Sequence, residues 1–170
     1  EYNKSIGIVQ VGIIEAFGLP ASDFGISSDP YCVVTLTGYS THGQEWPASM
    51  RRTYVTKSKN QSLYPRWKEF IDFDVARSGG VVRFEVFDWD TTSADDLLGY
   101  VEVPLEAIIS GEKIDLWIKL KLSFEFKKAL QIIKNKRHPS VRNQYIEDVT
   151  GSGEHASLRV ALRFHCSFMG

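Results

Sequence analysis

The sequence predicts an all-β fold in which eight short strands form an antiparallel β-sandwich. Eight segments alternate apolar and polar residues, so each strand has one apolar face and one polar face. Clusters of Gly, Pro, Ser and Asp separate these segments, as is typical of turns between strands. With 170 residues, of which 43% are hydrophobic and 24% charged, the chain can bury one core, so we expect a single domain over residues 1–170.

The expected strands follow one another along the chain. The first carries Val9, Val11 and Ile13 on one face. The last, at about 158–164, alternates apolar residues with arginines. The other six are expected at 31–36, 52–57, 69–75, 82–88, 99–103 and 114–119.

One helical insertion is expected before the last strand, at about residues 121–153. The run SFEFKKALQIIKNKR is rich in helix formers and places Phe126, Leu130 and Ile133 on one face. Residues 119–142 contain eight Lys or Arg residues and one acid. This basic helix is either an ordinary solvated surface or a patch that binds phosphate or an acidic protein partner.

The overall charge narrows the choice of partners. A formal net charge of -1 predicts no general attraction to nucleic acid, so an anionic partner requires a local patch or an acquired charge. No run approaches the roughly 18 apolar residues of a membrane span, and the first residues lack the order of a secretory signal. We expect a soluble, cytoplasmic, monomeric domain cut from a longer protein, with Cys32 and Cys166 as buried free thiols.

Two loops contain more acidic residues than the formation of turns explains. A single Asp usually closes a turn through its own side chain, but six together suggest a shared role. If the loops meet at one end of the sandwich, the mutual repulsion of the carboxylates costs several kcal/mol unless a cation neutralises them. The residues are Asp23 and Asp29 in the first loop, and Asp88, Asp90, Asp95 and Asp96 in the second.

Calcium is the cation that these ligands favour. Carboxylate oxygens are hard ligands, and calcium accepts six to eight of them in the irregular geometry that loops supply, whereas magnesium requires a tighter octahedron. An EF-hand is excluded, because Ser93 stands where that loop requires glycine and Gly99 where it requires a bidentate glutamate.

Four stretches in register resemble the C2 family found in protein kinase C and the synaptotagmins. They are GIVQVGIIEAFGLP, SDPYCVVTL, LYPRWKEFIDFDV, and FDWD followed by DDLLG. The resemblance implies an eight-stranded Greek-key sandwich. The order of the matching strands is similar to the circularly permuted, type II topology.

The resemblance also implies a calcium site that holds two or three ions. Its aspartate ligands would be Asp23, Asp29, Asp88, Asp90 and Asp96. Ser93 and the backbone carbonyls of Trp89 and Ala94 would supplement them, whereas Asp95 would not bind calcium directly and would contribute only negative electrostatic potential.

The function implied is calcium-dependent docking on anionic phospholipid membranes, as a peripheral module in signalling or vesicle trafficking. Phe24 and Ile26 are candidate membrane-inserting residues because apolar side chains are unusual at polar loop tips. Trp89 either inserts as well or packs within its own loop. Lys57 and Lys59, with Tyr31, resemble the family's phosphoinositide groove. Val55 and Phe87 depart from that pattern, which weakens the expectation of phosphoinositide selectivity.

Other classes of protein fit the sequence less well. The four histidines lie in unrelated segments, and the chain has no nucleophile motif, phosphate loop or zinc signature, so we expect no enzyme. An immunoglobulin-like sandwich lacks its Cys, Trp, Cys spacing. The remaining alternative is a protein-interaction module with weak or structural calcium binding, contacting its partner through the basic helix.

Overall fold

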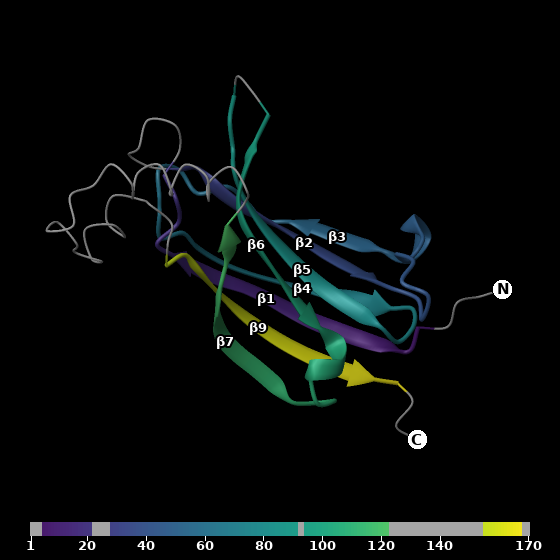
Figure 1. The fold of residues 1–170 in the computed structure, drawn as a ribbon. Coiled ribbons are helices and arrows are strands. Elements are labelled where there is room, and N and C mark those ends of the chain that lie inside the picture. The colour runs from purple at the N-terminus through teal and green to yellow at the C-terminus, as the bar shows by residue number, and fades with distance from the viewer. Residues whose placement is uncertain (1–4, 22–27, 92–93, 123–154, 168–170) are drawn as a thin grey trace, which may run out of the picture.

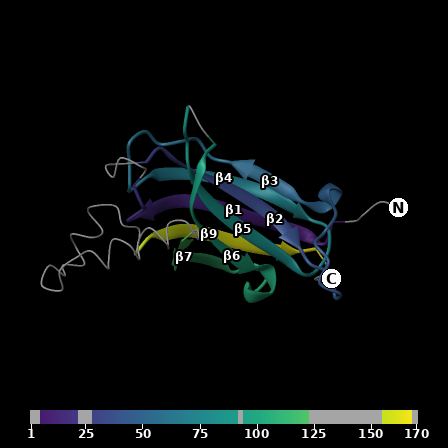
Figure 2. The same ribbon diagram turned by 45° about the horizontal axis from the view of Figure 1, so that its top comes forward.

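The computed structural model of the chain describes residues 5–21, 28–91, 94–122 and 155–167. In these residues, nine strands form two sheets that pack face to face (Figures 1 and 2). The predicted all-β sandwich is therefore confirmed. The strands are β1 (Gly7–Phe17), β2 (Pro30–Gly38), β3 (Arg52–Val55), β4 (Arg66–Val75), β5 (Gly80–Asp88), β6 (Asp96–Pro104), β7 (Lys113–Lys119), β8 (Lys121–Leu122) and β9 (Ser157–Cys166), with the 3-10 turns η1 (Ala48–Met50) and η2 (Leu105–Ala107).

All strand pairs in the two sheets are antiparallel. One sheet has the order β4-β1-β9-β7 and the other the order β3-β2-β5-β6-β8. Only β2–β3 and β5–β6 are consecutive strands within one sheet; at every other step along the chain the next strand lies in the opposite sheet, which gives the Greek-key connectivity. The first and last strands, β1 and β9, lie side by side along their whole length (Figure 1), as in the type II order expected.

The core lies between the two sheets and follows from the alternation of the strands. In β1, Val9, Val11 and Ile13 are at most 1% exposed. The opposite sheet contributes Phe84, which is among the largest fully buried side chains. The polar residues between these positions face outward, so one side of each sheet is left to solvent or to ligands.

Most predicted strands extend one to three residues further at an end than expected, and two strands differ in another way. β3 ends at Val55, before the expected 57, because the Thr56 hydroxyl accepts the Cys32 N–H (2.8 Å) and the Lys57 N–H donates to the Glu69 carboxylate (3.1 Å). β8 was not predicted, because two residues are too few to show an alternating pattern.

The remaining structural expectations concern the cysteines and the helices. Cys32 is buried, Cys166 is partly exposed, and both are free thiols. The helix expected at about 121–153 falls almost wholly outside the described residues. None of the helices among the described residues is long and apolar enough to cross a membrane.

Candidate metal centre

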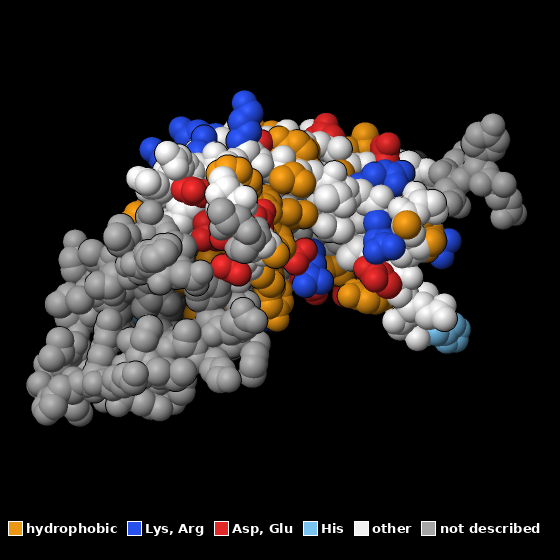
Figure 3. All heavy atoms as spheres, turned by 90° about the horizontal axis from the view of Figure 1, so that it is seen from above, with side chains coloured by type: hydrophobic (Ala, Val, Ile, Leu, Met, Phe, Trp, Pro, Cys, Tyr) orange, Lys and Arg blue, Asp and Glu red, His pale blue; other side chains and the backbone are white. Residues whose placement is uncertain are grey.

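The predicted aspartates are brought together by the register of the five-stranded sheet. Pro30, at the start of β2, pairs with Asp88, at the end of β5. Asp88 in turn pairs with Asp96, at the start of β6. Asp29 directly precedes β2, so three of the predicted ligands lie at one end of three adjacent strands. Acidic side chains also gather in one area of the face shown in Figure 3.

Asp88 is the most buried of these aspartates, with 7% of its surface exposed. Its Oδ1 accepts the backbone N–H of Asp29 at 2.7 Å. Burial raises the pKa of the Asp88 carboxyl, against the opposing effect of that N–H. The negative charges of Asp29, Asp96 and Asp90 raise the pKa further. Ionisation of Asp88 is therefore more costly than that of an exposed carboxyl, and nearby positive charge would reduce this cost.

Asp29 joins three segments at the same end of the sandwich. Its Oδ1 accepts the backbone N–H of Gln61 at 2.6 Å, and its carbonyl accepts the N–H of Trp89 at 3.0 Å. Gln61 has a left-handed backbone with φ 46°. No pattern in the sequence marks Gln61 for this role, because a backbone donor can come from any residue type except proline.

Asp95 has a structural role that its sequence position did not reveal. Its Oδ1 accepts the backbone N–H of Asp90 at 2.9 Å, and its Oδ2 accepts the hydroxyl of Tyr31. The Tyr31 ring stacks on Phe87 from the next strand, with centroids 5.6 Å apart and planes 18° apart. Burial and the Asp95 carboxylate both raise the pKa of the Tyr31 hydroxyl, so it remains a donor. Asp95 thus anchors the loop after β5 to β2.

The donor set fits a hard cation in its chemistry. Asp29, Asp88, Asp90 and Asp96 offer carboxylate oxygens only, and the raised pKa of Asp88 shows that burial and the neighbouring carboxylates disfavour its negative charge. Within the described residues, no three acidic, His or Cys side chains are arranged closely enough to hold a metal ion as they stand. The predicted ligands Asp23 and Ser93 lie outside the described residues.

The carbonyl ligands and the membrane-inserting residues remain predictions. Ala94 and Trp89 flank the second loop, and the Trp89 side chain is 49% exposed. Phe24 and Ile26 lie outside the described residues.

The predicted phosphoinositide groove contains one residue that is already engaged. Lys57 is exposed and Lys59 half-buried, and the Lys59 N–H donates to the carbonyl of Pro30 at 2.9 Å. The Tyr31 hydroxyl, however, donates to the Asp95 carboxylate, so an acidic group lies beside one of the three predicted lipid-binding residues. The part of these residues in lipid binding remains a prediction.

Comparison with known proteins places this geometry in a family. A family model described as the C2 domain matches residues 7–120. Human synaptotagmin-5 is 35% identical over 124 residues, covering 71% of this chain and 30% of the relative. Synaptotagmin-3 of Arabidopsis thaliana is 34% identical over 111 residues, covering 65% of this chain and 19% of the relative. The chain therefore spans less than a third of the length of these relatives.

Solved structures show the same fold. A single C2 domain of plant extended synaptotagmin 1 matches with a TM-score of 0.64 and 20% identity, covering 96% of this chain and 97% of that one. A structure of two C2 domains of extended synaptotagmin 2 matches with a TM-score of 0.63 and 19% identity, covering 96% of this chain and 43% of that one. The sandwich, its strand order and the family match together show that this chain belongs to the C2 domain family.

Proposed function

We propose that this domain binds calcium through the aspartates at one end of the sandwich and thereby docks on anionic phospholipid membranes. The observation that carries the proposal is Asp88, a buried carboxylate surrounded by the charges of three other aspartates. Such a cluster is costly to ionise on its own and is relieved by a divalent cation. Relatives that include synaptotagmin-5 and a multiple C2 and transmembrane domain-containing protein support a membrane role.

The proposed mechanism is an electrostatic switch. The six predicted loop aspartates repel an anionic bilayer while they are ionised and uncompensated. Two or three calcium ions would neutralise these carboxylates and offer coordination positions to lipid phosphate. Because binding is reciprocal, anionic lipid should tighten calcium binding by the same factor by which calcium tightens lipid binding.

The aspartates proposed to hold calcium are Asp23, Asp29, Asp88, Asp90 and Asp96, together with three supplementary ligands. Asp29 and Asp88 are held in place by backbone donors of the neighbouring loops, and Asp90 by the anchoring role of Asp95. Such preorganisation lowers the cost of bringing like charges together. The supplementary ligands are Ser93 and the carbonyls of Trp89 and Ala94.

Three further residues are proposed to enter the bilayer interface after docking. The half-exposed Trp89 side chain adjoins the aspartate cluster, where an aromatic ring gains apolar contact while its polar edge stays wet. Phe24 and Ile26 would insert from the first loop. We therefore assign the domain to a peripheral membrane location on the cytoplasmic side.

Phosphoinositide binding through Lys57, Lys59 and Tyr31 is a secondary part of the proposal. The two lysines supply positive charge, but the Asp95 carboxylate beside the Tyr31 hydroxyl opposes an anionic headgroup there. We therefore expect general binding of anionic lipids and weak discrimination among headgroups.

The test is sedimentation with phosphatidylserine-containing and neutral liposomes, each with calcium and with chelator. Pelleting only with calcium and anionic lipid supports the proposal, and the Asp88→Asn, Asp90→Asn double variant should abolish it. A double variant with the same charge change, Asp72→Asn and Asp74→Asn on the exposed face of β4, should pellet like the parent chain.

The other outcomes each point to a different function. Binding to anionic lipid in chelator would transfer the role to basic residues, either the groove or the stretch at about 121–153. No pelleting under any condition would favour the protein-interaction module, whose partner binding should be unchanged in chelator.

A further inference from the structure

A hollow of about 240 Å³ opens on the outer face of the four-stranded sheet, away from the aspartate loops. It exists because two small residues, Gly12 of β1 and Ala161 of β9, pair with each other at the centre of the sheet. A Cβ on Gly12 would lie 2.8 Å from the Phe70 ring and 3.2 Å from the Ala161 Cβ. The ring of Phe70 therefore forms a wall of the hollow directly beside Gly12.

Phe70 is unusual because it is a large apolar side chain on an open sheet face. It is 67% exposed, the largest exposed fraction among the large hydrophobic residues described. Its β1 partner is Gly12, so no side chain on that strand covers the ring at this position. A compact apolar group seated on Ala161, against the edge of the ring, would bury part of it.

The next row of the sheet carries two cations. Lys113 of β7 and Arg163 of β9 are direct Cα partners, and both line the hollow. Like charges directly opposite each other in a sheet repel, so this pair is unfavourable without an anion. Gln10 follows Arg163 in the row, and Asp72, a carboxylate that also lines the hollow, lies beyond Gln10 at the far side from the two cations.

Arg163 also has an unsatisfied donor. Its Nε is buried and has no hydrogen-bond acceptor among the described residues. Buried donors are nearly always paired, by protein, water or ligand. An oxyanion in the hollow would accept from this guanidinium and would offset the repulsion from Lys113.

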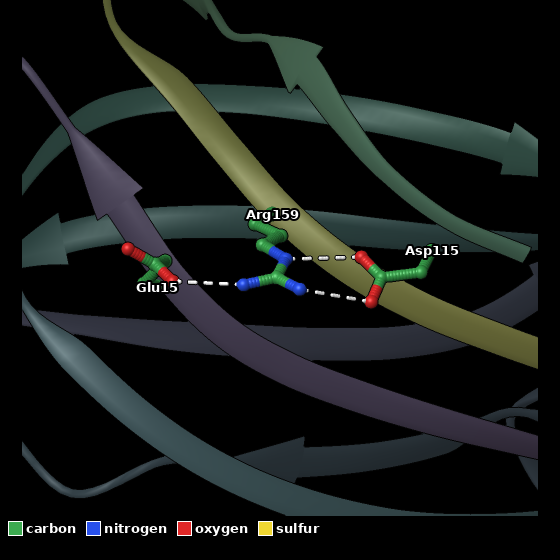
Figure 4. A network of polar contacts seen from close by, with 3 residues as sticks. All are labelled: Glu15, Asp115 and Arg159. Carbon is green, nitrogen blue, oxygen red and sulfur yellow. Dashed lines mark hydrogen bonds and ion pairs between the residues drawn. The ribbon is translucent and has the colours of Figure 1, made fainter.

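The neighbouring arginine on the same strand shows what an engaged guanidinium looks like. Arg159 bonds both oxygens of Asp115 at 3.0 Å and one oxygen of Glu15 at 3.2 Å (Figure 4). The charge of Lys113 helps to lower the pKa of Asp115, but the Asp115 carboxylate accepts its hydrogen bonds from Arg159. Arg163, farther along β9, has no such carboxylate partner in the part of the chain that is described.

We propose that the hollow between Phe70, Gly12, Ala161, Lys113 and Arg163 binds a free small organic anion, with a phosphate or carboxylate on the two cations and an apolar body against the Phe70 ring. The occupant is taken as a soluble molecule because the hollow is remote from the membrane-facing loops. Gly12 stands five residues before the end of β1 at Phe17, which is about 17 Å along the strand. The choice of a soluble occupant rests on the proposed membrane function, whereas the hollow and its two cations do not depend on it.

The test is an NMR titration of amide shifts in the 170-residue chain, in calcium-free buffer without added chelator, with phenyl phosphate and inorganic phosphate as probes. The amides of Gln10, Gly12, Ala161 and Arg163 should shift with phenyl phosphate, with a Kd of about 1 mM as for a small fragment. Inorganic phosphate should bind at least about tenfold more weakly, because it lacks the apolar body.

Variants separate the two halves of the proposed site. Arg163→Gln should weaken the binding of phenyl phosphate about tenfold or more, because it removes the charged donor. Ala161→Val should weaken it by filling the hollow, and a β-branched residue suits a strand, so the fold is retained. Lys119→Gln is the matched control: it removes a cation from β7 outside the hollow and should leave the titration unchanged.

Three results would overturn the proposal. They are the absence of shifts at these amides, equal binding by the Arg163→Gln variant, and equal binding of the two probes. Because calcium is absent throughout, none of these results bears on the membrane function, and a failure of calcium-dependent liposome binding would leave this site intact.

Discussion

Replacing Asp88 by Asn should stabilise the domain in chelator and remove most of its stabilisation by calcium. The two side chains have the same shape, and the Asn Oδ1 can still accept the Asp29 N–H that Asp88 accepts at 2.7 Å. The change therefore removes a buried negative charge without removing the hydrogen bond. Because burial and neighbouring carboxylates raise the pKa of Asp88, its ionised form costs stability at neutral pH, and the variant escapes this cost.

The size of the calcium effect follows from linkage. Calcium at about 100 times its Kd would stabilise the folded state by ~2.7 kcal/mol. For a chain of 170 residues, ~1 kcal/mol shifts the Tm by ~2–4 °C, so the parent Tm should rise by ~5–11 °C. If the variant binds calcium about 100-fold more weakly, the same concentration gives only ~0.4 kcal/mol, or ~1 °C.

The assay is thermal unfolding of both proteins by circular dichroism, in chelator and at increasing calcium. Asp74→Asn is the matched control, since Asp74 is an exposed aspartate of β4 in the other sheet and should leave both Tm values unchanged. A parent Tm that does not respond to millimolar calcium would refute the assignment of the site. A variant that is less stable than the parent in chelator would refute the argument that the charge on Asp88 is unfavourable.

Three further predictions concern residues that hold the site and the sheets in place. Tyr31→Phe removes the hydroxyl that donates a hydrogen bond to Asp95 and so loosens the loop after β5. The calcium-induced rise in Tm should therefore fall by the equivalent of ~1–2 kcal/mol, while the fold persists. Gly38→Ala would drive a Cβ into the buried indole ring of Trp46, so the Tm should fall by several degrees through overpacking of ~1–3 kcal/mol or more. Arg159→Gln removes the guanidinium that lowers the pKa of Asp115, so the variant should have a lower Tm than the parent at neutral pH. This difference in Tm should shrink as the pH falls below about 4, because protonated Asp115 no longer pairs with Arg159. Melts of parent and variant across this pH range would contradict the last prediction if their difference stayed constant.

The fold could be predicted because its signals are local. The alternation of Val9, Val11 and Ile13 identifies β1, and the same pattern identifies most of the other strands. The end of β3 was missed because it depends on a hydroxyl, that of Thr56, which meets a neighbouring strand only after folding. Pattern reasoning therefore locates strands more reliably than it locates their ends.

The site could be predicted only in outline, because its details depend on contacts between distant residues. The aspartates are visible in the sequence, but the roles of Gln61 and Asp95 as anchors come from backbone and hydroxyl contacts that no residue pattern encodes. The pairing of Lys113 with Arg163 likewise depends on strand register, which joins residues fifty positions apart in the sequence. Residue types thus predict which kinds of ligand the chain can bind, and strand register determines which residues come together in one site.

The pairing of β1 with β9 has a consequence for how the domain assembles. β1 is formed early in the chain, but its neighbour β9 comes last, and β7 has β9 as its sheet partner among the described strands. The four-stranded sheet cannot close until the final strand is available, so contacts of long sequence separation should make folding slow. Residues 123–156 join β8 to β9, and because closure entropy grows only slowly with length, this connection can change in size at little cost in stability. Cleavage within that connection would be tolerated only while β9 stays bound, whereas loss of β9 would leave β7 without its sheet partner and open the core beneath it.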